Sequence, residues 1–230
     1  MDTPTLLRRL ENGRTDLIHA LLSTADAAAT LQSRGADLLT WCSYYGDVTA
    51  CRLLLESGET LDALGPDLGL NGAAFHGHWQ LCEFLIESGA DANYVDPDTG
   101  ETPLHSAVAN EDRQRYDLVV EILLRAGADP NAATIAGMET GAFMRDCHTR
   151  GETPLHRAAA FGGQRTIEML IEAGADRERK DARGETPLAW ASWARRSEEI
   201  LRPLLYGPHR IRESYRPLRE NLLGRPDAED

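Results

Sequence analysis

Short apolar runs recur along the chain, and each is followed at a similar distance by a glycine. The clearest runs are Leu53–Leu55, Phe84–Ile86 and Leu123–Leu124, and the glycines of this kind are Gly58, Gly89, Gly127 and Gly174. This pattern is typical of short helices that end at a residue in the left-handed region, which glycine adopts without strain. Because helices this short are marginal alone, the pattern predicts helices stabilised by stacking on one another.

A second pattern marks where the preceding helices begin. The string Gly-Glu-Thr-Pro-Leu-His occupies 100–105 and 151–156, and Gly-Glu-Thr-Pro-Leu returns at 184–188. The threonine suits the N-cap of a helix, and the proline suits its first turn, where a missing N–H costs nothing. Glycines between the first and second helices mark the turn, at Gly46, Gly77 and Gly162. The repeating unit is therefore a pair of antiparallel helices.

A period near 33 residues built on Thr-Pro-Leu-His resembles the ankyrin repeat family. The resemblance covers roughly residues 34–207. It implies an all-α solenoid of stacked helix-turn-helix repeats with β-hairpin fingers, about six helix pairs in total. The repeats are expected at about 34–65, 66–95, 96–147, 148–180 and 181–207, between an N-terminal capping helix pair at 1–33 and a C-terminal extension at 208–230. The first two repeats are degenerate, since they lack the Thr-Pro-Leu-His string.

Two insertions interrupt the array. The shorter, around 111–117, is charged and fits a solvated turn between two helices. The longer enlarges one finger within 132–148 and contains the apolar residues Ile135, Phe143 and Met144. Apolar side chains are costly to leave in water, so these either fold back onto the array or contact a partner.

In the resembling family, partners lie across the finger tips and the exposed ends of the first helices. Carried over position by position, the resemblance implies a partner surface of aromatic groups ringed by charge, a composition common in binding hot spots. Its candidate residues are Trp41, Tyr44, Tyr45, Phe75, His76, Glu101, Phe143, Met144, Arg145, Arg150, Glu152, Arg157, Phe161, Arg183, Glu185, Trp190 and Trp193. For Trp41 and Trp190, the alternative is that they fill the space between repeats.

The charge of the chain narrows the class of partner. Its net charge is −13, which repels phosphates of nucleic acids and anionic membranes and favours a protein with a basic patch. No apolar run approaches the roughly 20 residues needed to span a bilayer. The start of the chain lacks the basic and apolar stretches of a signal peptide, so we expect a cytoplasmic location. We expect a monomer, with self-association left open.

The residues that could carry chemistry favour structure over catalysis. Cys42, Cys51 and Cys82 fall at apolar helix positions, and the four cysteines of the chain contain no C-x-x-C pair. The histidines of the repeat motif, His105 and His156, recur at the same place, which favours a structural role at the helix start. We therefore expect no enzyme activity, cofactor or metal. Two alternatives stay open, a thiol- or metal-dependent enzyme or regulator centred on 143–148 with Cys147-His148, and a self-associating scaffold.

Overall fold

The chain folds into helix pairs joined by loops. The computed structural model describes residues 2–109, 114–141 and 147–206. The N-terminal elements are α1 (Thr3–Glu11), a 3-10 turn η1 (Thr15–Leu17) and α2 (Ile18–Leu22). The helix pairs that follow are α3 (Ala27–Tyr44) and α4 (Val48–Glu56), α5 (Leu70–His76) and α6 (Trp79–Glu87), α7 (Pro103–Ala107) and α8 (Gln114–Arg125), α9 (Pro154–Phe161) and α10 (Gln164–Glu172), and α11 (Pro187–Trp193) and α12 (Glu198–Tyr206). Within the described residues, the expected all-α solenoid of about six helix pairs is thus confirmed.

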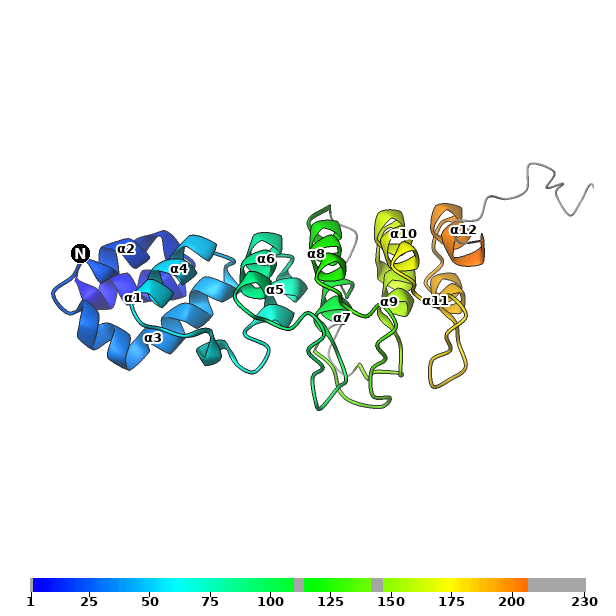
Figure 1. The fold of residues 1–230 in the computed structure, drawn as a ribbon, viewed down its shortest axis with the longest axis horizontal. Helices are drawn as coiled ribbons and strands as arrows, with labels where there is room; N and C mark the ends of the chain where they lie inside the picture. The colour runs from blue at the N-terminus through cyan, green and yellow to red at the C-terminus, as the bar shows by residue number, and fades with distance from the viewer. Residues whose placement is uncertain (1, 110–113, 142–146, 207–230) are drawn as a thin grey trace, which may run out of the picture.

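The pairs stack side by side into an elongated array (Figure 1). From α5 onwards, the first helices α5, α7, α9 and α11 follow one another in one layer, and their partners α6, α8, α10 and α12 form a second layer. The long loops between repeats project together beyond the layer of first helices. Loop residues and the ends of the first helices therefore face the same side of the molecule.

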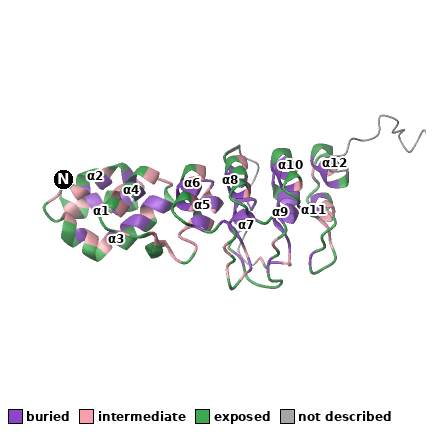
Figure 2. Ribbon diagram, in the orientation of Figure 1, coloured by how far each residue is buried: buried purple, intermediate pink, exposed green. Residues whose placement is uncertain are grey.

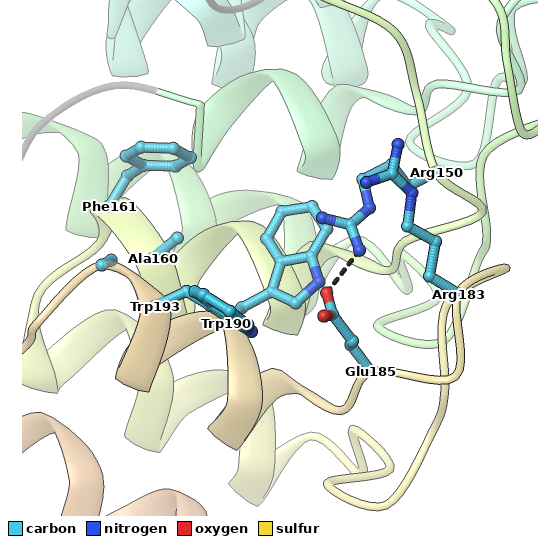
Figure 3. Close-up of a pocket in the computed structure, with 8 residues that line it drawn as sticks. Arg150, Ala160, Phe161, Arg183, Glu185, Trp190 and Trp193 are labelled. Atoms are coloured by element: carbon cyan, nitrogen blue, oxygen red, sulfur yellow. Dashed lines mark hydrogen bonds and ion pairs between the residues drawn. The ribbon is translucent and has the colours of Figure 1, made fainter.

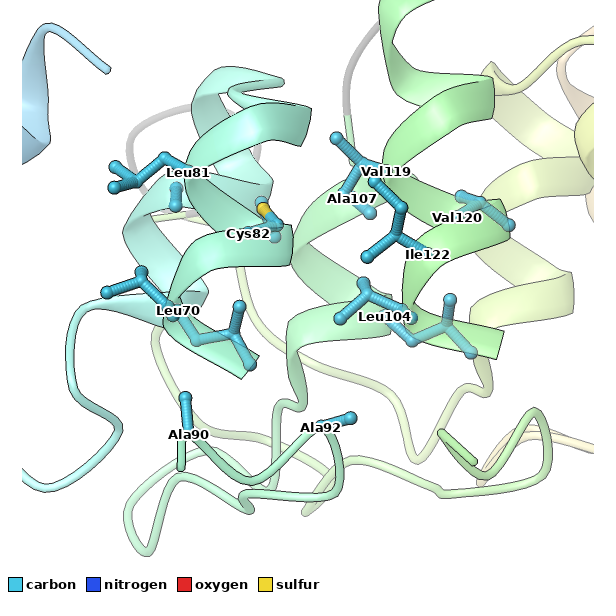
Figure 4. Close-up of a cluster of buried hydrophobic side chains, with 14 of the residues drawn as sticks. Leu70, Leu81, Cys82, Ala90, Ala92, Leu104, Ala107, Val119, Val120 and Ile122 are labelled. Carbon is cyan, nitrogen blue, oxygen red and sulfur yellow. The ribbon is translucent and has the colours of Figure 1, made fainter. Parts of the chain in front are cut away.

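The core lies between the layers and between neighbouring repeats (Figure 2). The leucines Leu70, Leu81 and Leu104 have no exposed surface, and Cys82 and Val119 are equally buried beside them (Figure 4). Burying one such side chain contributes about 1.5–3 kcal/mol. Because the contacts cross from one repeat to the next, each short helix depends on its neighbours.

The Thr-Pro-Leu-His string ties one repeat to the next. Thr102 caps α7, since its hydroxyl oxygen accepts from the His105 N–H at 3.4 Å. The Nδ1 atom of His105 accepts from the Thr102 N–H at 3.2 Å, so its Nε2–H donates to the Glu152 carbonyl oxygen of the next repeat at 3.2 Å. His156 repeats this arrangement towards the Glu185 carbonyl oxygen at 3.1 Å. The structural role expected for both histidines is confirmed.

The N-terminal part departs most from the regular pattern. α3 runs unbroken from Ala27 to Tyr44, so the expected boundary between cap and first repeat, at residues 33 and 34, falls inside one helix. The loop that follows α4 contains the 3-10 turn η2 (Leu61–Leu64). Glycines at the ends of second helices do adopt the left-handed region as predicted, with φ of 104° at Gly89 and 95° at Gly174.

Candidate functional site

The described part of the enlarged finger packs against its own array. Within it, the Gly137 N–H donates to the Thr149 carbonyl oxygen at 2.7 Å, and the Thr149 N–H donates to the Met138 carbonyl oxygen at 2.8 Å. The Ile135 N–H donates to the Thr99 carbonyl oxygen of the preceding loop at 2.8 Å. The only bridge of β type among the described residues joins Glu139 to His148. Three candidate contact residues, Phe143, Met144 and Arg145, lie outside the described residues.

A buried ion pair network holds the finger in place. The Arg157 side chain is fully buried, and its Nη2 lies 2.5 Å from Glu101 Oε1 and 2.6 Å from Glu152 Oε1. Glu152 also accepts from the Thr134 hydroxyl at 2.7 Å, and Glu101 accepts from the Thr140 hydroxyl at 2.8 Å. The network therefore joins α9 to two successive fingers.

This network buries two of the residues that were predicted to contact a partner. Glu152 is 1% exposed and Arg157 is 0% exposed, so neither can touch a partner while the repeats stay folded. Their assignment to the surface was wrong, because the charge of each is neutralised inside the array. Burial alone raises the pKa of Glu152, but the Arg157 guanidinium and the hydrogen bonds from the Arg150 N–H and Thr134 outweigh it and bring the pKa to about 2. Glu152 is thus a buried carboxylate at neutral pH.

His105 beside this network is neutral. Burial lowers its pKa to about 3, and the nearby Arg157 guanidinium acts in the same direction. A neutral imidazole is what the two hydrogen bonds of the motif require, because Nδ1 must accept while Nε2 donates. The histidine therefore acts as a structural link between repeats.

A pocket of about 540 Å³, the C-terminal pocket, lies between the last two fingers and the ends of α9 and α11 (Figure 3). Its lining residues are Arg150, Ala160, Phe161, Arg183, Glu185, Trp190, Trp193 and Ala194. Trp193 is 76% exposed and Phe161 is 38% exposed, which is unusual for large apolar side chains. The pocket therefore offers an aromatic surface to a ligand.

Trp190 is a fixed wall of the C-terminal pocket. Its Nε1–H donates to Asp181 Oδ2 at 3.0 Å, and the Arg150 guanidinium lies 5.1 Å from its ring centre. Arg150 in turn pairs with Asp181 at 2.9 Å and with Glu185. The ring is half-buried, so it both fills space between repeats and lines the pocket.

A smaller pocket of about 220 Å³, the N-terminal pocket, lies at the other end of the same side of the array. Its lining residues are Thr40, Ser43, Tyr44, Ala63, Leu64, Gly69, Gly72 and His76. The Tyr44 ring is 56% exposed and meets the His76 ring edge-on, with centres 4.8 Å apart. Phe75 is half-buried and packs edge-on against His76 at 5.2 Å.

Other aromatic candidates at this end also support the fold. The Tyr45 hydroxyl donates to the Glu11 carbonyl oxygen at 3.1 Å and so ties α3 to the N-terminal helices. Trp41 is half-buried against the core, with the Arg34 guanidinium 5.4 Å from its ring centre. These two residues are therefore anchored in the array, although Tyr45 keeps 41% of its surface exposed.

The two pockets are built alike. Each combines the last turn of a first helix with residues of a loop between repeats, and the surface that runs from one pocket to the other is the groove. The sequence pattern predicted the aromatic side chains of both pockets. It missed Ala63, Leu64 and Gly69 because the loop that carries them lacks the repeat motif.

Three of the four cysteine thiols are buried. Burial raises the pKa of the Cys51 and Cys82 thiols to about 12, and the pKa of Cys42 is raised as well. Cys147 is half-buried next to the exposed His148. In the described ranges no three His, Cys, Asp or Glu side chains are grouped so that they could hold a metal ion. Nor does any helix in those ranges have the length and apolar character to cross a membrane.

The helix-pair repeats of this chain match models of a known family. A model of ankyrin repeats in many copies matches residues 73–123, and a model of three ankyrin repeats matches residues 136–212. The chain belongs to the ankyrin repeat family. Ankyrin repeats generally mediate protein–protein interactions and are typically not catalytic.

Curated relatives match over short stretches. Rabankyrin-5 of Mus musculus is 34% identical over 88 residues, which is 38% of this chain and 7% of the relative. The ankyrin repeat and SOCS box protein 11 of Danio rerio is 31% identical over 105 residues, covering 38% of this chain and 34% of the relative. The NF-kappa-B inhibitor alpha of Gallus gallus is 32% identical over 89 residues, covering 39% of this chain and 24% of the relative. The chain thus spans at most about a third of these relatives, so the likeness concerns the repeats.

Proposed function

We propose that this ankyrin repeat chain is a non-catalytic interaction module that binds a protein partner through its fingers and the groove. The observation that carries the proposal is the exposure of Trp193 in the C-terminal pocket, 76% of its surface. A tryptophan side chain covers roughly 200 Å². At about 25 cal/mol per Å², covering the exposed part of Trp193 would favour a complex by about 4 kcal/mol before the costs of association.

The setting of Trp193 supports this role. Trp190 and Arg150 are held by hydrogen bonds and ion pairs, so the pocket wall is already in place before a ligand arrives. Phe161 lies across the pocket from Trp193 (Figure 3). A preformed aromatic pocket with polar groups at its edge binds with little loss of conformational entropy.

The partner we propose carries a basic patch, because the net charge of the chain is −13. Its association should weaken as salt rises, since salt screens such charges. A cytoplasmic location belongs to the same proposal. All four cysteines are free, and free thiols suit a reducing compartment.

The test uses partner capture followed by affinity measurement. The full chain captures proteins from a cell lysate, and the captured protein is then titrated by calorimetry against wild type, Trp193→Ala, Tyr44→Ala and the control Leu118→Ala. Leu118 is 42% exposed on α8, in the second layer away from the groove. We expect the two groove variants to bind at least about tenfold more weakly and the control to bind normally. Unchanged affinity in both groove variants would refute the assignment.

A further inference from the structure

The negative charge of this chain is concentrated in one block. Between Leu53 and Asp112 there are twelve Asp and Glu residues and no Lys or Arg, so this block carries −12 of the net charge of −13. Residues 113–206 contain equal numbers of acidic and basic residues. The N-terminal half of the groove therefore carries an excess of acidic residues, and the Arg115 guanidinium is the cation that acts on His76 of its pocket, where it helps to lower the pKa after burial.

Two acidic side chains adjoin the loop wall of the N-terminal pocket, and two more lie in the next loop. Asp62 is exposed in η2, directly before Ala63 and Leu64 of the pocket wall, and Asp67 lies in the loop that leads to α5. Asp96 and Asp98 lie in the next loop along the array. None of these four carboxylates forms an ion pair with a Lys or Arg in the described part of the chain.

The two loops bring their charges together. Burial and then the carboxylates of Asp96, Asp67 and Asp98 raise the pKa of the Tyr94 hydroxyl. Carboxylates of both loops therefore act electrostatically on the same hydroxyl. In the N-terminal pocket, the exposed face of Tyr44 offers a surface on which a guanidinium or ammonium group can stack.

The C-terminal pocket does not share this excess of acidic groups. Arg183 is exposed among its lining residues, and the Arg196 guanidinium donates to the carbonyl oxygen of Ala160, another lining residue, at 3.1 Å. Arg150 is neutralised by Asp181 and Glu185. The pocket is therefore aromatic with an arginine at its edge, and it lacks the excess of carboxylates that would attract a cationic side chain.

We infer that the groove is divided by charge, and that it binds an extended segment of a partner protein with Lys or Arg residues at the N-terminal pocket and one large apolar side chain in the C-terminal pocket. This inference rests on the proposed function and adds the direction in which the segment lies. The pockets are three repeats apart, or about 30 Å if neighbouring helices pack about 10 Å apart. That distance exceeds the screening length of about 8 Å at physiological salt, so the two ends act separately. An extended segment of about ten residues covers it.

The probe for the experiment is a fluorescein-labelled synthetic peptide. It carries a cluster of arginines at one end and a phenylalanine at the other, joined by a glycine–serine spacer of about ten residues. A second peptide has the opposite order, and a third has glutamates in place of the arginines. Binding to the full chain is followed by fluorescence anisotropy at low and at physiological salt.

The matched variants remove the same charge at different places. Asp62→Asn with Asp98→Asn removes two exposed carboxylates of the loops, and Glu121→Gln with Glu172→Gln removes two exposed carboxylates of α8 and α10 in the second layer. We expect the loop pair of substitutions to lower the affinity for the arginine peptide roughly tenfold at low salt. The second-layer pair should lower that affinity less than about threefold. Equal weakening by both pairs would show that only the overall charge attracts the peptide, and the inference would be overturned.

A cross-linking arm locates the two ends of the peptide. A photoreactive group beside the arginines should label residues within 53–112, and one beside the phenylalanine should label residues lining the C-terminal pocket. If both ends of the peptide labelled residues in the same half of the groove, the division by charge would be overturned. It would also be overturned if sedimentation showed one peptide bound between two copies of the chain. These peptide results do not test the proposed function. That proposal fails only if Trp193→Ala and Tyr44→Ala leave the affinity for the natural partner unchanged.

Discussion

Replacing Arg157 by methionine should destabilise the repeat array more than any exposed substitution. Methionine keeps much of the length of the side chain but removes the guanidinium that pairs with Glu101 and Glu152. Both carboxylates then lose their cation, and Glu152 is 1% exposed. Breaking a buried ion pair by removing one partner costs about 3–5 kcal/mol. For a chain of this size that corresponds to a fall in Tm of roughly 10 °C.

The pKa of Glu152 reflects the same contact with Arg157. It is lowered to about 2 in the folded protein from an ordinary value of 4.5. A difference of this size corresponds to about 3 kcal/mol of stability. Because the pKa is depressed, this contribution is fully present above about pH 4.5 and is lost as the pH falls towards 2. In Arg157→Met the same loss of stability on acidification should be much smaller.

The assay is urea unfolding followed by circular dichroism from pH 2 to pH 7, with Arg165→Met as the matched control. Arg165 is exposed on α10, so its replacement should change the free energy of unfolding by less than about 0.5 kcal/mol. Amide hydrogen exchange at Gly137 and Thr149 reports whether the finger itself loosens. A loss of less than about 1 kcal/mol in Arg157→Met, with wild-type pH dependence and wild-type exchange, would falsify the role assigned to the network.

Three further predictions concern the caps, the groove and the thiols. Thr102→Ala should lower the free energy of unfolding by about 1–2 kcal/mol in urea, because it removes the N-cap of α7, and an unchanged midpoint would count against that cap. Trp193→Ala should leave Tm within about 2 °C of wild type by calorimetry, since most of the ring is already in solvent, and a larger fall would mean that the ring supports the fold. Cys82 should resist a thiol reagent at pH 8 until the chain unfolds, because burial raises its pKa to about 12; rapid labelling of Cys82 in the folded chain, located by mass spectrometry, would contradict its burial.

The repeat itself could be read from local sequence. A threonine at an N-cap, a proline in the first turn and a glycine at a helix end act within a few residues, so their effect does not depend on distant parts of the chain. Thr102 and Gly89 behave as this reasoning requires. The aromatic residues of the groove, such as Trp193 and Phe161, could be found in the same way because each lies in the last turn of the first helix of its repeat, at one of two adjacent positions.

Tertiary structure decided which charged side chains are available to a partner. Glu152 and Arg157 have the residue types of a surface, yet both are buried, because Arg157 meets Glu101 from a loop that precedes it by more than fifty residues. The same holds for Trp190, which contacts Asp181 and Arg150 from two different fingers. Helix caps and periodicity are local, whereas burial and pairing depend on the neighbouring repeat. The sequence by itself therefore determined the repeating unit, and the stacking of one unit on the next determined the surface that it presents.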